Sequence, residues 1–120
     1  MHPASNSVKY FGLYAIATGV GLLLVPGLVL SPLGIPAPTE IWIRVVGALA
    51  IPLGYYYWVC GSANLVEFFR ASIRGRLLFA AIVVLLIAAF SAPLQMLLFA
   101  GLDLAGAAWT YQGLRKAAST

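Results

Sequence analysis

Charged residues are scarce in this chain, and their scarcity sets the first limit on what the protein is. The 120 residues include seven lysines and arginines, three acids and one histidine, so Asp, Glu, Lys and Arg make up only 8%. Soluble domains carry about 25% charged residues. Apolar residues reach 62%, and a small soluble domain has too little interior to bury them. We therefore predict an integral membrane protein with the lipid bilayer as its solvent.

Cysteine and histidine are almost absent too, which limits the chemistry that the chain can perform. Cys60 is alone, so the sequence has no intrachain disulfide and no CxxC motif. His2 and Cys60 together supply too few ligands for a zinc or haem site. No Ser-His-Asp set, phosphate loop or dinucleotide fingerprint is present. We predict no catalytic residues and no metal, and a bound lipid or quinone stays open.

The basic residues, with a net charge of +4, lie at the ends of hydrophobic runs. This placement favours a role in membrane orientation over nucleic-acid binding. If both termini are cytoplasmic, Arg44 alone falls on the outer side, which gives a strong positive-inside bias. We predict a bacterial cytoplasmic membrane protein with both termini inside. The cytoplasmic basic residues are then Lys9, Arg70, Arg74, Arg76, Arg115 and Lys116.

The hydrophobic runs predict a single all-α domain, an integral membrane four-helix bundle with spans at about 9–30, 41–60, 77–91 and 93–114. The last two spans follow from a length argument. The 38 residues between Arg76 and Arg115 would form one helix about 57 Å long, nearly twice the hydrocarbon thickness. Ser91, Ala92 and Pro93 form the turn-like break in the middle, so the two halves should be antiparallel neighbours.

The connections and prolines suggest further local structure. Asn64 and Glu67 have the spacing of a capping box, and the residues up to 76 have one apolar and one charged face. We predict a short interfacial amphipathic helix there, between the second and third spans. Pro26 and Pro52 should bend the first and second spans, and Thr39 is a plausible N-cap for the second.

Two charged residues lie inside predicted spans. Asp103 is midway along the fourth span, where a carboxylate costs at least a few kcal/mol. It could handle protons or ions, serve as a structural acid, or simply be protonated. Arg44 either pairs with Asp103 or extends to the outer headgroups. We favour a structural role for Asp103, with Arg44 as the natural partner in an intramembrane polar pair.

Small residues recur on the predicted helix faces, where they let membrane helices approach closely. On the fourth span the stripe includes Phe99, Asp103 and Thr110. Packing within the chain is favoured over docking of another subunit. The glycines concerned are Gly12, Gly19, Gly47, Gly54, Gly106 and Gly113.

Aromatic residues crowd the far end of the second span, and Tyr14 adds a polar group to the first. Such clusters are typical of the membrane–water interface. The alternative is a pocket for a flat ligand such as a quinone. The clustered residues are Tyr55, Tyr56, Tyr57 and Trp58.

Four features carry a family resemblance. They are the run 44–47 (Arg-Val-Val-Gly), Gly54, the basic segment 74–76 (Arg-Gly-Arg) and Asp103. Together these resemble the DoxX/DoxD-like superfamily, over about residues 10–115. The resemblance implies a four-helix membrane bundle, and some members are subunits of quinone-linked sulfur oxidation systems. It carries over no catalytic residues. The size is also similar to that of small multidrug resistance transporters, but those need a glutamate in the first span, which has no acid here.

The sequence predicts a non-catalytic accessory or scaffolding subunit of a larger membrane complex. A redox or quinone-linked complex is one such setting. The alternative is an oligomeric small transporter or ion channel that uses Asp103. An enzyme acting on a lipid or quinone has the least support. The expected partners are the bilayer and other membrane subunits or further copies of the chain.

Overall fold

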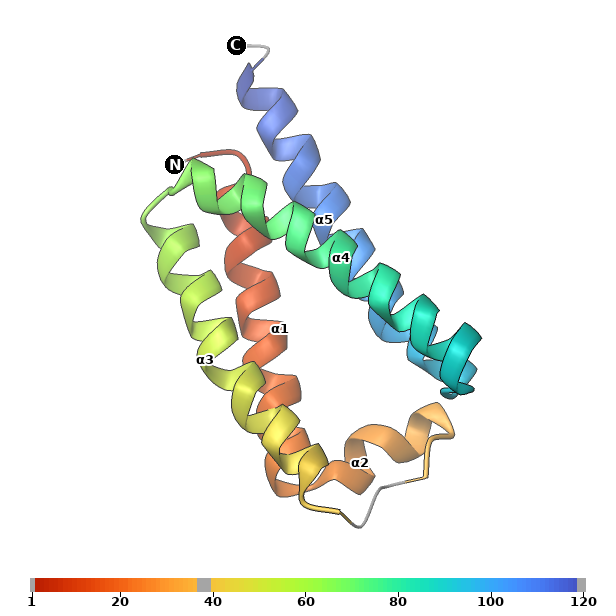
Figure 1. The fold of residues 1–120 in the computed structure, drawn as a ribbon. Coiled ribbons are helices and arrows are strands. Elements are labelled where there is room, and N and C mark those ends of the chain that lie inside the picture. Colours follow the sequence, from red (N-terminus) through yellow and green to blue (C-terminus); the bar gives the residue numbers. More distant parts are fainter. Residues whose placement is uncertain (1, 37–39, 119–120) are drawn as a thin grey trace.

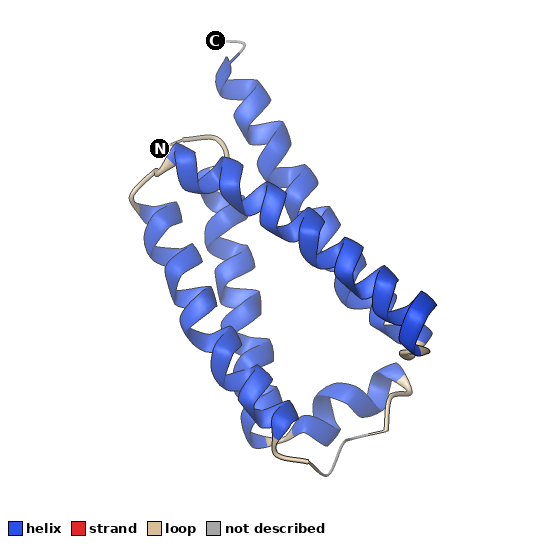
Figure 2. Cartoon of the chain, in the orientation of Figure 1, coloured by secondary structure: helices blue, strands red, loops and turns tan. Residues whose placement is uncertain are grey.

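The computed structural model describes residues 2–36 and 40–118, and within these ranges it contains helices and no strand (Figure 2). The predicted all-α class is confirmed. The predicted N-cap Thr39 lies outside the described residues. In chain order the elements are α1 (Ser5–Leu24), α2 (Pro26–Leu30), η1 (Ser31–Leu33), α3 (Trp42–Ser62), α4 (Val66–Phe90), η2 (Leu94–Met96) and α5 (Leu97–Ala118).

The long helices form two antiparallel hairpins, α1 with α3 and α4 with α5 (Figure 1). The hairpins meet where α1 begins and α5 ends, and they diverge toward the other end. There, α2 and η1 run from the end of α1 toward the α4–α5 turn. Leu30 and Ile35 pack against Met96 and Phe99, which closes the divergent end.

The α1–α3 hairpin packs through glycine on glycine. A Cβ built at Gly12 would lie 2.6 Å from the carbonyl oxygen of Gly54, and one at Gly19 would lie 2.7 Å from that of Gly47. No larger side chain fits these contacts without moving backbone. On each helix the two glycines are seven residues apart, which places them on one face. The backbones therefore approach at two successive points along the hairpin.

Three helices in the described part of the chain are long and apolar enough to cross a membrane, namely α1, α3 and α4. This is compatible with an integral membrane protein. Large apolar side chains are exposed along α3 and α4, as with Trp42, Leu78 and Leu85. α5 has 22 residues but is less apolar, because it carries Asp103 and a basic last turn.

α1 ends where Pro26 interrupts it. Proline lacks an N–H and its ring clashes with the preceding turn, so the first run divides into α1 and α2 at Val25. Pro52, by contrast, lies inside α3, which continues past it.

The prediction of a separate interfacial helix before the third span is wrong. Residues 66–90 form the single helix α4, and Leu65 is its N-cap with no side-chain hydrogen bond. The capping box does not form, because Asn64 adopts a left-handed conformation and accepts a hydrogen bond from the backbone N–H of His2 at 2.9 Å. The sequence from 66 to 90 has no proline, so helix propensity alone imposes no break.

Candidate functional site

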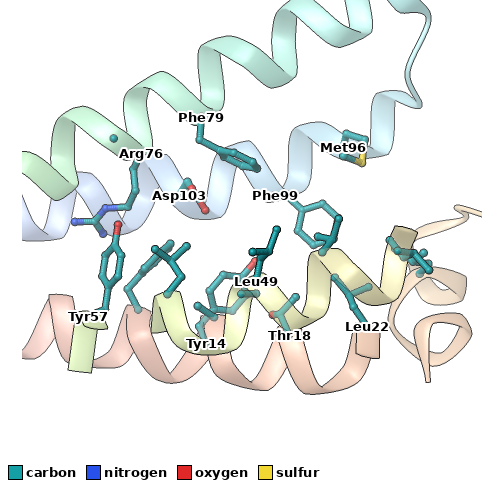
Figure 3. A pocket seen from close by; sticks show the side chains of 18 residues that line it. Tyr14, Thr18, Leu22, Leu49, Tyr57, Arg76, Phe79, Met96, Phe99 and Asp103 are labelled. Atoms are coloured by element: carbon teal, nitrogen blue, oxygen red, sulfur yellow. The ribbon is translucent and has the colours of Figure 1, made fainter. Parts of the chain in front are cut away.

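A cavity of about 540 Å³ lies between the two hairpins (Figure 3). Its volume falls in the range of about 300–1,000 Å³ that is usual for small-molecule sites. Apolar side chains from α1, α2, α3, α4 and α5, together with Met96 of η2, form most of its wall. The polar side chains in the wall are few, and they are Tyr14, Thr18, Tyr57, Arg76 and Asp103.

Arg76 is the most deeply buried charged residue described, with 2% of its surface exposed. Its Nε donates a hydrogen bond to the Ser72 carbonyl oxygen at 3.1 Å. Its Nη2 donates to the Ser72 hydroxyl and to the Thr110 hydroxyl, both at 2.9 Å. Ser72 is one turn before Arg76 on α4, whereas Thr110 is on α5. Two of the three guanidinium nitrogens are therefore fixed by neutral oxygens.

Thr110 extends this polar network to α1. Its hydroxyl is fully buried and lies 2.7 Å from the buried hydroxyl of Ser7. Ser7 also bonds the Ala4 carbonyl oxygen at 2.7 Å, and Thr110 bonds the Gly106 carbonyl oxygen at 3.1 Å. The chain of contacts from Ser72 through Arg76 and Thr110 to Ser7 joins α4, α5 and α1 where the hairpins meet.

Two aromatic rings hold the guanidinium from the other side. The Arg76 guanidinium carbon lies 4.8 Å from the centre of the Phe11 ring and 5.7 Å from that of Tyr57. A cation over an aromatic face is stabilised by the ring quadrupole. Tyr57 is itself buried and contacts the rings of Phe11 and Phe68. The side chain of Arg76 is thus restrained both by hydrogen bonds and by ring contacts.

The third guanidinium nitrogen, Nη1, is buried and has no hydrogen-bond partner among the described residues. It lies beside Gly106, where a Cβ would come within 3.0 Å of it. A buried donor without a partner costs about 1–3 kcal/mol, and more for a charged group. Other atoms of Arg76 form part of the cavity wall, whereas Nη1 itself is buried within the protein.

Asp103 lies on the same face of α5 as Gly106 and Thr110, three residues before Gly106. It is half-buried in the cavity wall (Figure 3). Across the described residues no hydrogen bond or ion pair to its carboxylate is formed, although its charge and that of Arg76 act on each other. The cavity wall therefore contains one acidic and one basic side chain, Asp103 and Arg76, that do not form a salt bridge with each other.

The predicted pair of Arg44 and Asp103 is not formed, and this is a correction. Arg44 is exposed, and its Nη1 donates to the carbonyl oxygens of Leu23 at 2.5 Å and Leu24 at 3.3 Å. Helices end with carbonyl groups that lack intrahelical partners, and a cation there also meets the negative end of the helix dipole. The break before Pro26 supplies these acceptors close to Arg44, so its side chain caps α1 instead.

The aromatic cluster predicted on the second span divides into two groups. Tyr57 is buried beside Arg76, and Tyr14 of α1 also lines the cavity. Tyr55, Tyr56 and Trp58 are exposed on α3, and Lys9 lies over the Trp58 ring at 4.6 Å. The cluster thus contributes one member to the site.

The predicted packing glycines of α5 make different contacts. Gly106 lies against Arg76 and Phe11, whereas Gly113 lies against the backbone of Ala4. Neither contact resembles the glycine-on-glycine packing of α1 and α3.

Among the predicted orientation residues, Arg76 differs from the rest. Arg70, Arg74, Arg115 and Lys116 are exposed, and Arg70 pairs with Glu67 at 2.8 Å. The sequence placed Arg76 with them at the membrane surface, whereas the structure places it inside. Ser7 and Ser72 were not identified from the sequence at all. The signal for Ser72 was its position four residues before Arg76, which puts both on one helix face.

The arrangement has the chemistry of a binding site for an amphiphilic molecule. Its walls are mostly apolar, and a few polar side chains, among them Tyr14, Thr18 and Asp103, provide orientation. No group of three His, Cys, Asp or Glu side chains suited to a metal occurs within residues 2–36 and 40–118.

Comparison with family models, curated proteins and solved structures gave no match for this chain. Its function is accordingly inferred from the geometry of the cavity.

Proposed function

We propose that the chain is an integral membrane protein in which α5 crosses the bilayer together with α1, α3 and α4. The length and hydropathy of those three helices support this. So does the largest dimension of the molecule, 50 Å, which compares with about 40–45 Å for a bilayer with its headgroups. Asp103 faces the cavity, so its charge is no obstacle to the insertion of α5. The basic residues favour cytoplasmic termini in a bacterial cytoplasmic membrane.

Topology can be tested by cysteine labelling, because Cys60 is the single cysteine. In a Cys60→Ala background, Asn6→Cys places one thiol near the start of α1, and Ala92→Cys places one in the α4–α5 turn. In intact cells a membrane-impermeant thiol reagent should label position 92 and leave position 6 unlabelled until the membrane is opened. Labelling of both positions, or of position 6 alone, in intact cells contradicts the proposed topology.

Within this fold the cavity between the hairpins binds an apolar or amphiphilic ligand, and the protein acts as a non-catalytic accessory subunit of a larger membrane complex. The observation that carries this proposal is the cavity of about 540 Å³, whose mostly apolar wall includes Asp103 without an ion pair among the described residues. A quinone-linked complex is the setting suggested by the resemblance to DoxX/DoxD-like proteins.

Binding is tested by native mass spectrometry of protein extracted in a mild detergent. The wild type should retain a lipid-sized adduct. Ala50→Trp, which fills the cavity from α3, should lose it. Ala48→Trp is the matched control, because Ala48 is exposed on the same helix. Equal adducts in all three proteins would contradict a cavity site. The same extraction tests the accessory role, since a chain that runs only alone would argue against a complex.

The second candidate is an oligomeric transporter or channel, and the observation that favours it is the carboxylate of Asp103 in the cavity wall without an ion pair among the described residues. Ion or proton flux in reconstituted vesicles should then fall strongly in Asp103→Asn. Flux that is absent from the wild type, or unchanged by the substitution, removes this candidate.

A further inference from the structure

We propose that the ligand of this cavity is an uncharged lipid with a free hydroxyl group, and that this hydroxyl donates a hydrogen bond to the carboxylate of Asp103. The inference rests on the proposed binding function and adds the chemistry of the ligand. It is carried by an acceptor in the cavity wall that has no hydrogen-bond or ion-pair partner among the described residues and is not fully buried.

The carboxylate oxygens of Asp103 are accessible from the cavity. Within the described part of the chain, Arg76 Nη1 is the fully buried side-chain nitrogen or oxygen that lacks a hydrogen-bond partner. The oxygens of the half-buried Asp103 also lack a partner, so they retain accessible surface, and Asp103 is one of the residues that line the cavity (Figure 3). A molecule inside the cavity therefore meets an acceptor with no partner in the described chain.

Arg76 does not satisfy this carboxylate by direct contact. Its Nε and Nη2 donate to Ser72 and Thr110, and two aromatic rings lie against the guanidinium. These contacts hold the arginine at the junction of the hairpins, while Asp103 remains a polar group in a mostly apolar wall. A carboxylate without a hydrogen bond in such surroundings is costly, so a donor on the ligand would stabilise the complex.

The ligand group has to be a donor, because an ionised carboxylate only accepts hydrogen bonds. An ester, ether or ketone oxygen also only accepts, so it cannot pair with Asp103. Hydroxyl and ammonium groups both donate, and hydrogen bonds to a charged acceptor are stronger than those between neutral groups. The charge of the ligand therefore decides between the two.

The charges around Asp103 favour a hydroxyl over an ammonium or an anion. Arg76 lies close enough for its charge to act on Asp103, and its guanidinium forms no ion pair within the described residues. An ammonium bound at Asp103 would therefore be repelled by Arg76, whereas an anion there would be repelled by Asp103 itself. A hydroxyl donates the same hydrogen bond without adding a charge.

The rest of the cavity suits the hydrocarbon chain of such a lipid. Phe99 lies one turn before Asp103 on the same face of α5. Leu22 and Met96 lie on that side of the cavity too, away from Arg76 (Figure 3). The hydroxyl end of the ligand would therefore lie at Asp103, and its chain would extend toward the divergent end of the hairpins.

The test measures lipid binding by native mass spectrometry for wild type, Asp103→Leu and Gln112→Leu. Oleyl alcohol and dioleoylglycerol are two sources of the hydroxyl, and each is compared with its methyl ether, which keeps the oxygen and loses the donor. Oleylamine and oleate carry a positive and a negative head on the same chain. Gln112 is exposed on α5 and is not part of the cavity wall, so its variant is the matched control.

In the wild type, the better of the two hydroxyl lipids should bind about tenfold or more tightly than its methyl ether, as expected for a hydrogen bond to a charged group. That lipid identifies the source of the hydroxyl. Asp103→Leu should abolish the preference for hydroxyl over ether, and Gln112→Leu should keep it. Asp103→Asn, which keeps an acceptor oxygen without the charge, should show a smaller preference than the wild type.

The outcomes separate this inference from the proposed function. Equal binding of alcohol and ether by the wild type, an undiminished preference in Asp103→Leu, or tighter binding of oleylamine or oleate than of the alcohol overturns the inference while a cavity site stands. Absence of any binding that responds to Ala50→Trp overturns the proposed function itself. Gel filtration and helical circular dichroism show whether each variant is folded. If Asp103→Leu does not fold, an undiminished preference in Asp103→Asn likewise overturns the inference.

Discussion

The two contact regions of this molecule, α1 with α3 and the junction of α1, α4 and α5, are built in opposite ways. In the first, glycines bring two backbones into direct contact and leave no space. In the second, a buried arginine is held by two hydroxyls and two rings, and one of its nitrogens stays unpaired beside a cavity. The first arrangement serves stability, because it places no polar side chain at the contact. The second retains an unsatisfied charge, and such local conflicts are expected at functional sites.

The largest expected effect comes from closing the glycine contact. Gly54→Leu should separate α1 from α3, because its Cβ would meet the Gly12 carbonyl and the Ile16 backbone. Overpacking of a close interface costs about 1–3 kcal/mol and often more. Thermal unfolding in detergent should show a large fall in midpoint. Gly101→Leu, in open space on α5, should change it little. Similar falls for both would mean that the glycine contact is unimportant.

A smaller loss is expected at the junction of the hairpins. Thr110→Val keeps the shape but removes the acceptor of Arg76 Nη2 and the partner of Ser7. A buried donor left unpaired costs about 1–3 kcal/mol. Denaturant unfolding should show a loss in this range. Thr18→Val, at a cavity position outside the network, is the control. A Thr110→Val protein as stable as the wild type would show that the network contributes nothing.

The arginine itself should matter less for stability than the hydroxyl that holds it. In Arg76→Met the hydroxyls of Ser72 and Thr110 keep their bonds to the carbonyls of Phe69 and Gly106. Because a buried charge is expensive to desolvate, replacement by an apolar residue of similar size is often neutral or stabilising. We expect a change in unfolding free energy within about 1 kcal/mol, measured by denaturant unfolding. A loss of stability larger than that of Thr110→Val would contradict this expectation.

The smallest effect concerns the pair that is not formed. Arg44→Gln and Asp103→Asn should have additive effects on unfolding free energy within about 0.3–0.5 kcal/mol, because the residues share no contact. Arg76→Gln combined with Asp103→Asn should depart from additivity, since these two charges act on each other. Double-mutant cycles measure both. A coupling energy between Arg44 and Asp103 that exceeds the one between Arg76 and Asp103 would support the pair predicted from the sequence.

Local features of the fold could be predicted from the sequence. The helices and the turn region at 91–93 follow from hydrophobic length, which is local information. The stripe through Asp103, Gly106 and Thr110 follows from helical spacing. Thr110 is indeed buried, Gly106 lies against Arg76, and Asp103 lines the cavity. Both features need only the chain's own periodicity.

The partners of the charged residues could not be predicted in the same way. An arginine at the end of a polar stretch resembles a surface charge, and only tertiary structure places Phe11 and Thr110 around Arg76. Arg44 was assigned to Asp103 because both were charged and intramembrane. Its actual acceptors are backbone carbonyls, which every residue carries and which no sequence pattern distinguishes. Pro26 was the available hint, since a break there leaves carbonyls free.

The most direct test of the central claim is to map where a neutral lipid contacts the protein. A diacylglycerol with a diazirine in its acyl chain, added to protein in nanodiscs and activated by light, should crosslink to cavity residues such as Leu22, Leu49 and Phe99. Ala50→Trp should reduce those crosslinks, and Ala48→Trp should not. Crosslinks concentrated on outward residues such as Leu78 and Leu85, unchanged by Ala50→Trp, would contradict the account.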